Sequence, residues 1–136
     1  MVGDAELEGD VRALLARWTQ AYVARDAAAY ADLFHRGADP VVAWATGEVT
    51  RGWKPLFEHV QREFYHQKAV VKSVDVHDLS VARVHEELAE AAFRYDVLAV
   101  DLWGTTHTLH RLATMTLVAT KDGWRVVGAH FSTVAP

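Results

Sequence analysis

Apolar residues recur with a helical period in the first half of the chain. Between residues 5 and 25, the apolar side chains that share one helical face are Val11, Leu14, Leu15, Trp18 and Tyr22. Asp26 interrupts this pattern and is suited to cap a second helix over residues 27–34. Gly52 precedes a third helix that reaches about residue 65, and Pro55 fits its first turn because no hydrogen bond is lost there. The pattern therefore predicts three N-terminal helices.

The period changes to two after residue 67. Long strands are predicted at residues 70–84, 88–100, 105–120 and 124–132. A shorter strand is predicted at 41–46, and a turn at 47–51. Helices followed by long strands with short turns are typical of an α+β domain. We expect the three helices to pack on one face of a strongly curved antiparallel sheet, with a cavity between the layers.

Length and charge limit the classes of function. A chain of 136 residues fits one domain, so we expect a single domain over residues 1–136. The net charge of −4 and the scattered basic residues argue against a nucleic-acid partner. The absence of cysteine excludes disulfides and thiolate catalysis. Residues 1–10 hold acids and no apolar run, so we expect no signal peptide or membrane span and a cytoplasmic protein.

Several short motifs together resemble one superfamily. They are Trp18, Arg25-Asp26, Leu33-Phe34, Gly47, Gly52 and the closing stretch Asp-Gly-Trp-Arg-Val-Val-Gly-Ala-His-Phe-Ser at 122–132. Their order and spacing resemble the NTF2-like superfamily, and within it the SnoaL-like branch that includes the association domain of calmodulin-dependent kinase II. The resemblance implies a cone-shaped half-barrel with an internal pocket, usually dimerised through its convex sheet face. It implies no single chemistry, because members include isomerases, cyclases, dehydratases and assembly domains.

The closing hairpin decides which side chains face the pocket. Asp122-Gly123 lies between two runs of β-forming residues and predicts a tight turn. A two-residue turn at Asp122-Gly123 would pair Met115 with His130 and Thr114 with Phe131. A three-residue turn with a glycine bulge would slip this pairing by one residue and mix the two faces.

The resemblance assigns the pocket to the face that carries Thr114 and Phe131. Trp124 and His130 would then lie on the convex face, at a dimer contact. The residues expected to bind the ligand are Trp18, Tyr22, Trp44, Phe93, Tyr95, Thr114, Thr116 and Phe131. Most such rings pack in a core, and two or three that line a cavity would suit a hydrophobic cyclic ligand.

His110 is the candidate catalytic residue. On the assumed inner face it is the only group that titrates near neutrality, with Tyr95 and the two threonines as hydrogen-bond partners. The alternative is that His110 only hydrogen-bonds the wall. The resemblance implies that a ketosteroid-isomerase mechanism would need acids and a tyrosine at Val42, Trp18 and Thr114, and those groups are missing.

The eight histidines do not indicate a metal site. His107 and His110 are three residues apart on a predicted strand, so their side chains leave opposite faces. A zinc site needs three or four convergent ligands. We therefore expect neither a metal nor a cofactor.

Two classes of function remain. The first is a SnoaL-like pocket protein that binds a small hydrophobic molecule, with isomerase, cyclase or dehydratase chemistry by proton transfer on a cyclic substrate. The second is a non-catalytic association domain that serves oligomerisation, and a homodimer is expected in either case. Kinase association domains carry pocket arginines, whereas the matching positions are Tyr95, Thr116 and Phe131, which argues against an anionic ligand.

Overall fold

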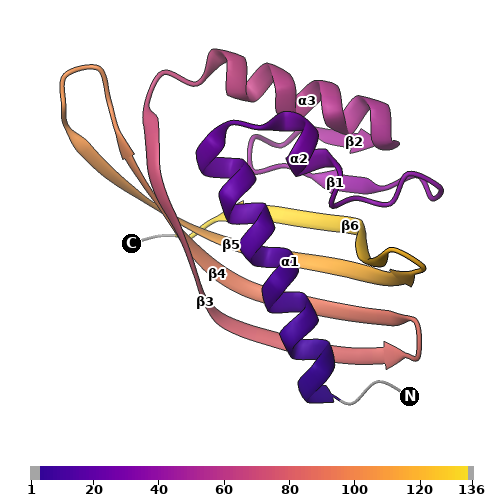
Figure 1. Ribbon diagram of the computed structural model, residues 1–136. Helices are drawn as coiled ribbons and strands as arrows, with labels where there is room; N and C mark the ends of the chain where they lie inside the picture. Colours follow the sequence, from indigo (N-terminus) through magenta and orange to yellow (C-terminus); the bar gives the residue numbers. More distant parts are fainter. Residues whose placement is uncertain (1–3, 135–136) are drawn as a thin grey trace.

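The computed structural model describes residues 4–134 and contains helices on one side of a curved sheet (Figure 1). The helices are α1 (Asp4–Ala24), α2 (Ala27–Ala31) and α3 (Trp53–His66). The strands are β1 (Val41–Ala43), β2 (Val49–Arg51), β3 (Val70–His85), β4 (Leu88–Val100), β5 (Thr106–Thr120) and β6 (Gly123–Thr133). Helix α1 crosses the concave face, while α2 and α3 lie at the edge of the sheet formed by β1 and β2. This arrangement confirms the predicted α+β half-barrel.

The sheet is mixed rather than wholly antiparallel. Its strand order is β2-β1-β6-β5-β4-β3, and β1 runs parallel to β6 while every other pair is antiparallel. The cause lies just before β1, where the chain already follows β6. There Val126 N donates to Leu33 O, and His35 N donates to Val126 O, both at 2.9 Å. The predicted turn at 47–51 is also corrected, because part of it forms β2.

Bulges give the long strands their curvature. The pairing of β3 with β4 is interrupted between Val71 and Ser73, between His77 and Ser80, and near the β3–β4 turn. Each interruption adds local twist to the strand. The result is a sheet that bends around α1 but stays open, with β2 and β3 as its edges (Figure 1).

The caps of the short helices follow the sequence. The Asp26 side chain accepts a hydrogen bond from Ala29 N at 3.0 Å and so begins α2 as predicted. Helix α2 ends at Ala31 rather than at residue 34, because the residues that follow pair with β6. The indole N–H of Trp53 donates to Ala31 O at 2.8 Å and holds the start of α3 against α2.

Trp18 is the centre of the core. Its side chain is only 1% exposed, and the apolar stripe of α1 around it is buried as predicted. The Trp18 ring stacks on Phe131 at 6.1 Å between centroids and meets Phe93 and Tyr95 edge to face at 5.7 and 5.0 Å. One side chain therefore joins α1 to both β4 and β6.

We expect Trp18→Ala to lower the free energy of unfolding by about 3–5 kcal/mol, since it removes a large buried ring and leaves a cavity. Urea denaturation followed by circular dichroism measures the change. Val23→Ala on the exposed side of α1 is the matched control and should cost well under about 1 kcal/mol. A loss for Trp18→Ala no larger than for this control would contradict the placement of Trp18 in the core.

Candidate functional site

The β5–β6 hairpin fixes the orientation of β5. Thr120 pairs with Gly123 around a two-residue turn at Lys121-Asp122, and Gly123 adopts a φ of +103° that favours glycine. A bulge follows between Val126 and Gly128. A turn one residue earlier than expected shifts the pairing by two residues, and the bulge restores one, so both predicted pairings are off by one residue.

The slip exchanges the two faces of β5. Ala113 pairs with Phe131, and both are buried on the helix side of the sheet. His110, Thr114 and Thr116 alternate with the buried residues and so lie on the outer face. Their predicted position on the pocket wall is therefore wrong.

The two residues expected on the convex face, Trp124 and His130, lie on opposite faces of the sheet. Trp124 is 8% exposed and belongs to the core, so its expected position on the convex face is wrong. His130 pairs with Thr114 and is exposed on the outer face, as expected. The bulge in β6 accounts for the difference, because Trp124 and His130 lie on opposite sides of it.

A cavity of about 160 Å³ lies between the helices and the sheet. It is lined by Tyr22, Tyr30, Trp44, Ala45, Thr46, His59, Val60, Glu63, Phe64, Tyr95, Arg111 and Phe131. Four of the eight predicted ligand-binding residues are in this set: Tyr22, Trp44, Tyr95 and Phe131. Trp18 and Phe93 lie behind the wall in the core. The cavity is mainly aromatic, with a few polar groups.

A series of aromatic rings, each stacked on the next, extends from the core to the cavity. Phe131 stacks on Trp18 on one side and on Trp44 on the other, where the centroids are 5.5 Å apart. Trp44 in turn stacks on His59 at 4.1 Å. The indole N–H of Trp44 donates to Thr50 Oγ1 at 3.0 Å, which fixes the ring. The position of His59 is thus set by packing that begins at Trp18.

His59 is the buried histidine of the site. It is 3% exposed, and its Nδ1 is hydrogen-bonded to the Glu48 carboxylate. Arg62 donates to both oxygens of Glu48, at 3.3 and 3.1 Å, and so holds that carboxylate in place. A carboxylate on Nδ1 favours the tautomer that leaves Nε2 free to accept a proton. This geometry is suited to general-base chemistry.

Sequence reasoning missed His59, although a clue was present. His59 follows Leu56 by three residues on α3 and therefore belongs to the helix face that packs inward. Glu48 lies in the turn before β2, far enough along the chain that only the fold brings the two together.

Three phenols line the cavity, of which Tyr30 and Tyr95 are buried and Tyr22 is partly buried. Burial raises the pKa of Tyr22, Tyr30 and Tyr95 above the ordinary tyrosine value, most strongly for Tyr30. The Arg111 guanidinium acts in the opposite direction on Tyr22 and Tyr95 but does not outweigh burial. All three phenols therefore stay protonated at neutral pH and can donate hydrogen bonds.

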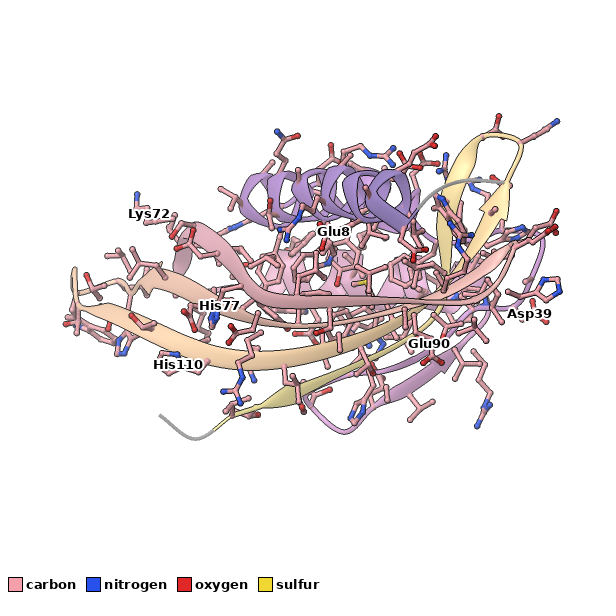
Figure 2. All side chains as sticks on the ribbon, turned by 90° about the horizontal axis from the view of Figure 1, so that it is seen from below. Glu8, Asp39, Lys72, His77, Glu90 and His110 are labelled. Carbon is pink, nitrogen blue, oxygen red and sulfur yellow. The ribbon has the colours of Figure 1, made fainter. Side chains whose placement is uncertain are left out.

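His110 belongs to a separate cluster on the outer face. Asp96 lies between His110 Nδ1 at 2.7 Å and His77 Nε2 at 3.1 Å. Figure 2 shows both histidines on the side of the sheet away from α1. The His110 hydrogen bond, with the charge of His77, holds the Asp96 pKa below its usual value. Within residues 4–134, no group of three or more histidine, aspartate or glutamate side chains is arranged to hold a metal ion.

The chain matches the SnoaL-like domain family over residues 11–136 and belongs to it. The predicted resemblance is therefore confirmed. A comparison with curated proteins gives no match. Within the described part of the chain, no helix is long and apolar enough to cross a membrane.

Three solved structures illustrate the shared fold. An NTF2-like superfamily protein from Salmonella enterica is 17% identical with a TM-score of 0.83, covering 98% of this chain and 95% of that one. A ketosteroid isomerase-like protein from Erwinia carotovora is 14% identical with a TM-score of 0.76, covering 94% and 96%. A proposed calcium/calmodulin dependent protein kinase II association domain from Xanthomonas campestris is 18% identical with a TM-score of 0.79, covering 98% and 89%. At these identities the likeness establishes the fold alone.

The outer cluster gives a prediction about Asp96. We expect His110→Ala to raise the Asp96 pKa toward the ordinary value of about 3.9, because the largest favourable contact is removed. A folded-state pKa below the unfolded value stabilises the protein above about pH 4, and this contribution is lost as pH falls through the folded-state pKa. Carboxyl NMR titration measures the shift. His130→Ala, on the same face, should leave Asp96 unchanged, and equal shifts in the two variants would contradict the assignment.

Proposed function

We propose that the protein binds a small cyclic molecule in the cavity and transfers a proton on it, with His59 as the general base. The observation that carries this proposal is the hydrogen bond between buried His59, which lines the cavity, and the exposed Glu48 carboxylate. Catalytic histidines commonly have one ring nitrogen held by a carboxylate while the other meets the substrate. His59 therefore takes the role that the sequence had suggested for His110.

The size and lining of the cavity favour a ring as the ligand. Its volume is about 160 Å³, and apolar cavities of about 150 Å³ can hold a benzene ring. Trp44, Phe131 and, from α3, Phe64 line the cavity with apolar ring atoms. Aromatic walls of this kind suit a planar or cyclic molecule more than a flexible chain.

The reaction that fits is proton transfer at a carbon beside a carbonyl. His59 Nε2 takes the carbon-bound proton, and the electron pair of the C–H bond moves onto the carbonyl oxygen as an enolate. The Glu48 carboxylate stabilises the imidazolium that forms. The protonated phenols of Tyr22 and Tyr95 are the donors available to the enolate oxygen. In a substrate with a C=C bond next to that carbon, return of the proton to the far end of the conjugated system completes an isomerisation.

The alternative class, an association domain, is favoured by one feature of the sheet. Within residues 4–134, no helix covers its outer face (Figure 2). Leu112 is 38% exposed on that face, near Thr114 and His130. We propose that two copies pair through this face. Pairing leaves the cavity on the opposite side free, so the two proposals are compatible.

The proton-transfer proposal predicts that the protein accelerates deuterium exchange at the carbons beside the carbonyl of cyclohexanone in D₂O. His59→Gln should lower the catalysed rate by about 10²–10⁴, which is what loss of a general base costs. Glu48→Gln should lower it less, because the base remains but its orienting carboxylate is lost. Proton NMR of the ketone follows the exchange.

Two outer-face variants make this experiment decisive. His130→Gln is the matched control and should keep the parental rate. His110→Gln should also keep it, whereas the assignment from sequence requires a large loss. A ketone that binds but exchanges no faster than in buffer would contradict the catalytic proposal, and only ligand binding would remain supported.

The pairing proposal predicts a dimer at micromolar concentration by light scattering. Leu112→Glu should give a folded monomer, because it places a like charge from each copy in an apolar contact. Val23→Glu, on the helix side, is the control and should remain dimeric. A parental protein that scatters as a monomer would count decisively against pairing.

A further inference from the structure

Arg111 is a charged group of the cavity with no carboxylate partner in the described part of the chain. Its Nη1 donates to the Thr133 hydroxyl at 3.1 Å, a neutral acceptor. Other arginines of the protein meet carboxylates, as Arg62 does with Glu48 and Arg94 with Asp78. A guanidinium has five N–H donors, so one hydroxyl leaves most of them available to a ligand.

The position of Arg111 directs that charge toward the cavity. It lies on the inner face of β5, directly opposite the buried Tyr95, and lines the cavity together with Tyr22. Its charge influences both phenols, since it counteracts part of the increase that burial causes in their pKa. The guanidinium and two phenolic O–H groups therefore form a donor-rich side of an otherwise apolar cavity.

Glu63 limits how much negative charge a ligand can carry near Arg111. It lines the cavity from α3 but forms no ion pair with Arg111, so it does not neutralise the guanidinium directly. Glu63 is exposed, and its charge also influences Tyr22. A single negative charge beside Arg111 would be attracted, whereas a second one near Glu63 would be repelled.

We propose that the ligand is a cyclic monocarboxylate whose ring packs against the aromatic wall of the cavity and whose carboxylate pairs with Arg111. This inference rests on the proposed function, because it names the chemical class of the ring-bearing ligand. Arginine matches a carboxylate with two parallel hydrogen bonds, a geometry that lysine or a neutral donor does not reproduce. The sequence argued against an anion because the positions that match the pocket arginines of kinase association domains are Tyr95, Thr116 and Phe131, and Arg111 was not considered as a cavity residue.

A matched pair of probes tests the charge. Benzoate and benzamide share a ring and nearly the same shape, but only benzoate is anionic at neutral pH. We expect the parental protein to bind benzoate about tenfold tighter or more, in keeping with hydrogen bonds to a charged group. Calorimetry measures both affinities, and quenching of tryptophan fluorescence reports contact with the cavity through Trp44.

Variants of Arg111 separate its charge from its packing. Arg111→Gln should abolish the preference for benzoate while benzamide still binds, and Arg111→Lys should retain part of it. Arg94→Gln, on the outer face, is the matched control and should keep the full preference. Thermal melts establish that each variant is folded. Should Arg111→Gln fail to fold, the comparison with Arg111→Lys and a decrease of the preference at high salt still test the charge.

Each outcome decides between the two proposals. Equal binding of benzoate and benzamide by the parental protein would overturn the carboxylate assignment and leave the cavity as a site for neutral rings. A benzoate preference that persists in Arg111→Gln would also overturn it. No binding of benzoate, benzamide or cyclohexanone would overturn the proposed function together with this inference.

Discussion

The bulge between Val126 and Gly128 determines which side chains the cavity receives. Because side chains alternate along a strand, one extra residue in β6 reverses the faces that it presents on either side of the bulge. It allows Trp124 and Phe131 both to be buried although they are an odd number of residues apart. With Phe131 fixed against Trp18, its partner Ala113 faces inward, and so does Arg111 two residues away. The polar side of the cavity follows from this one irregularity.

The same aromatic core that stabilises the fold also positions the proposed base. Trp18, Phe131 and Trp44 stack in sequence, and His59 is the last ring of that series. Glu48 and Arg62 then fix the histidine from the other side through charged hydrogen bonds. A residue held by packing on one face and by a carboxylate at one nitrogen has little freedom left. Such restraint is what a catalytic or binding group requires.

Sequence patterns predicted the elements well because they depend on local information. The apolar stripe of α1, the Asp26 cap and the four long strands all follow from periodicity and turn residues. The site was predicted less well because it depends on pairing at a distance. A one-residue error in the hairpin moved His110 and Thr114 to the wrong face, and the contact between His59 and Glu48 exists only once α3 packs beside β2.

Contacts between a bound ring and the protein test the central claim, that the inner face of β5 and the His59 wall enclose the ligand. Nuclear Overhauser effects from cyclohexanone protons to assigned side chains would measure them. The account predicts contacts with Trp44, His59 and Phe131 and none with the methyl groups of Thr114 and Thr116. Contacts with either threonine, in place of the Trp44 ring, would contradict it.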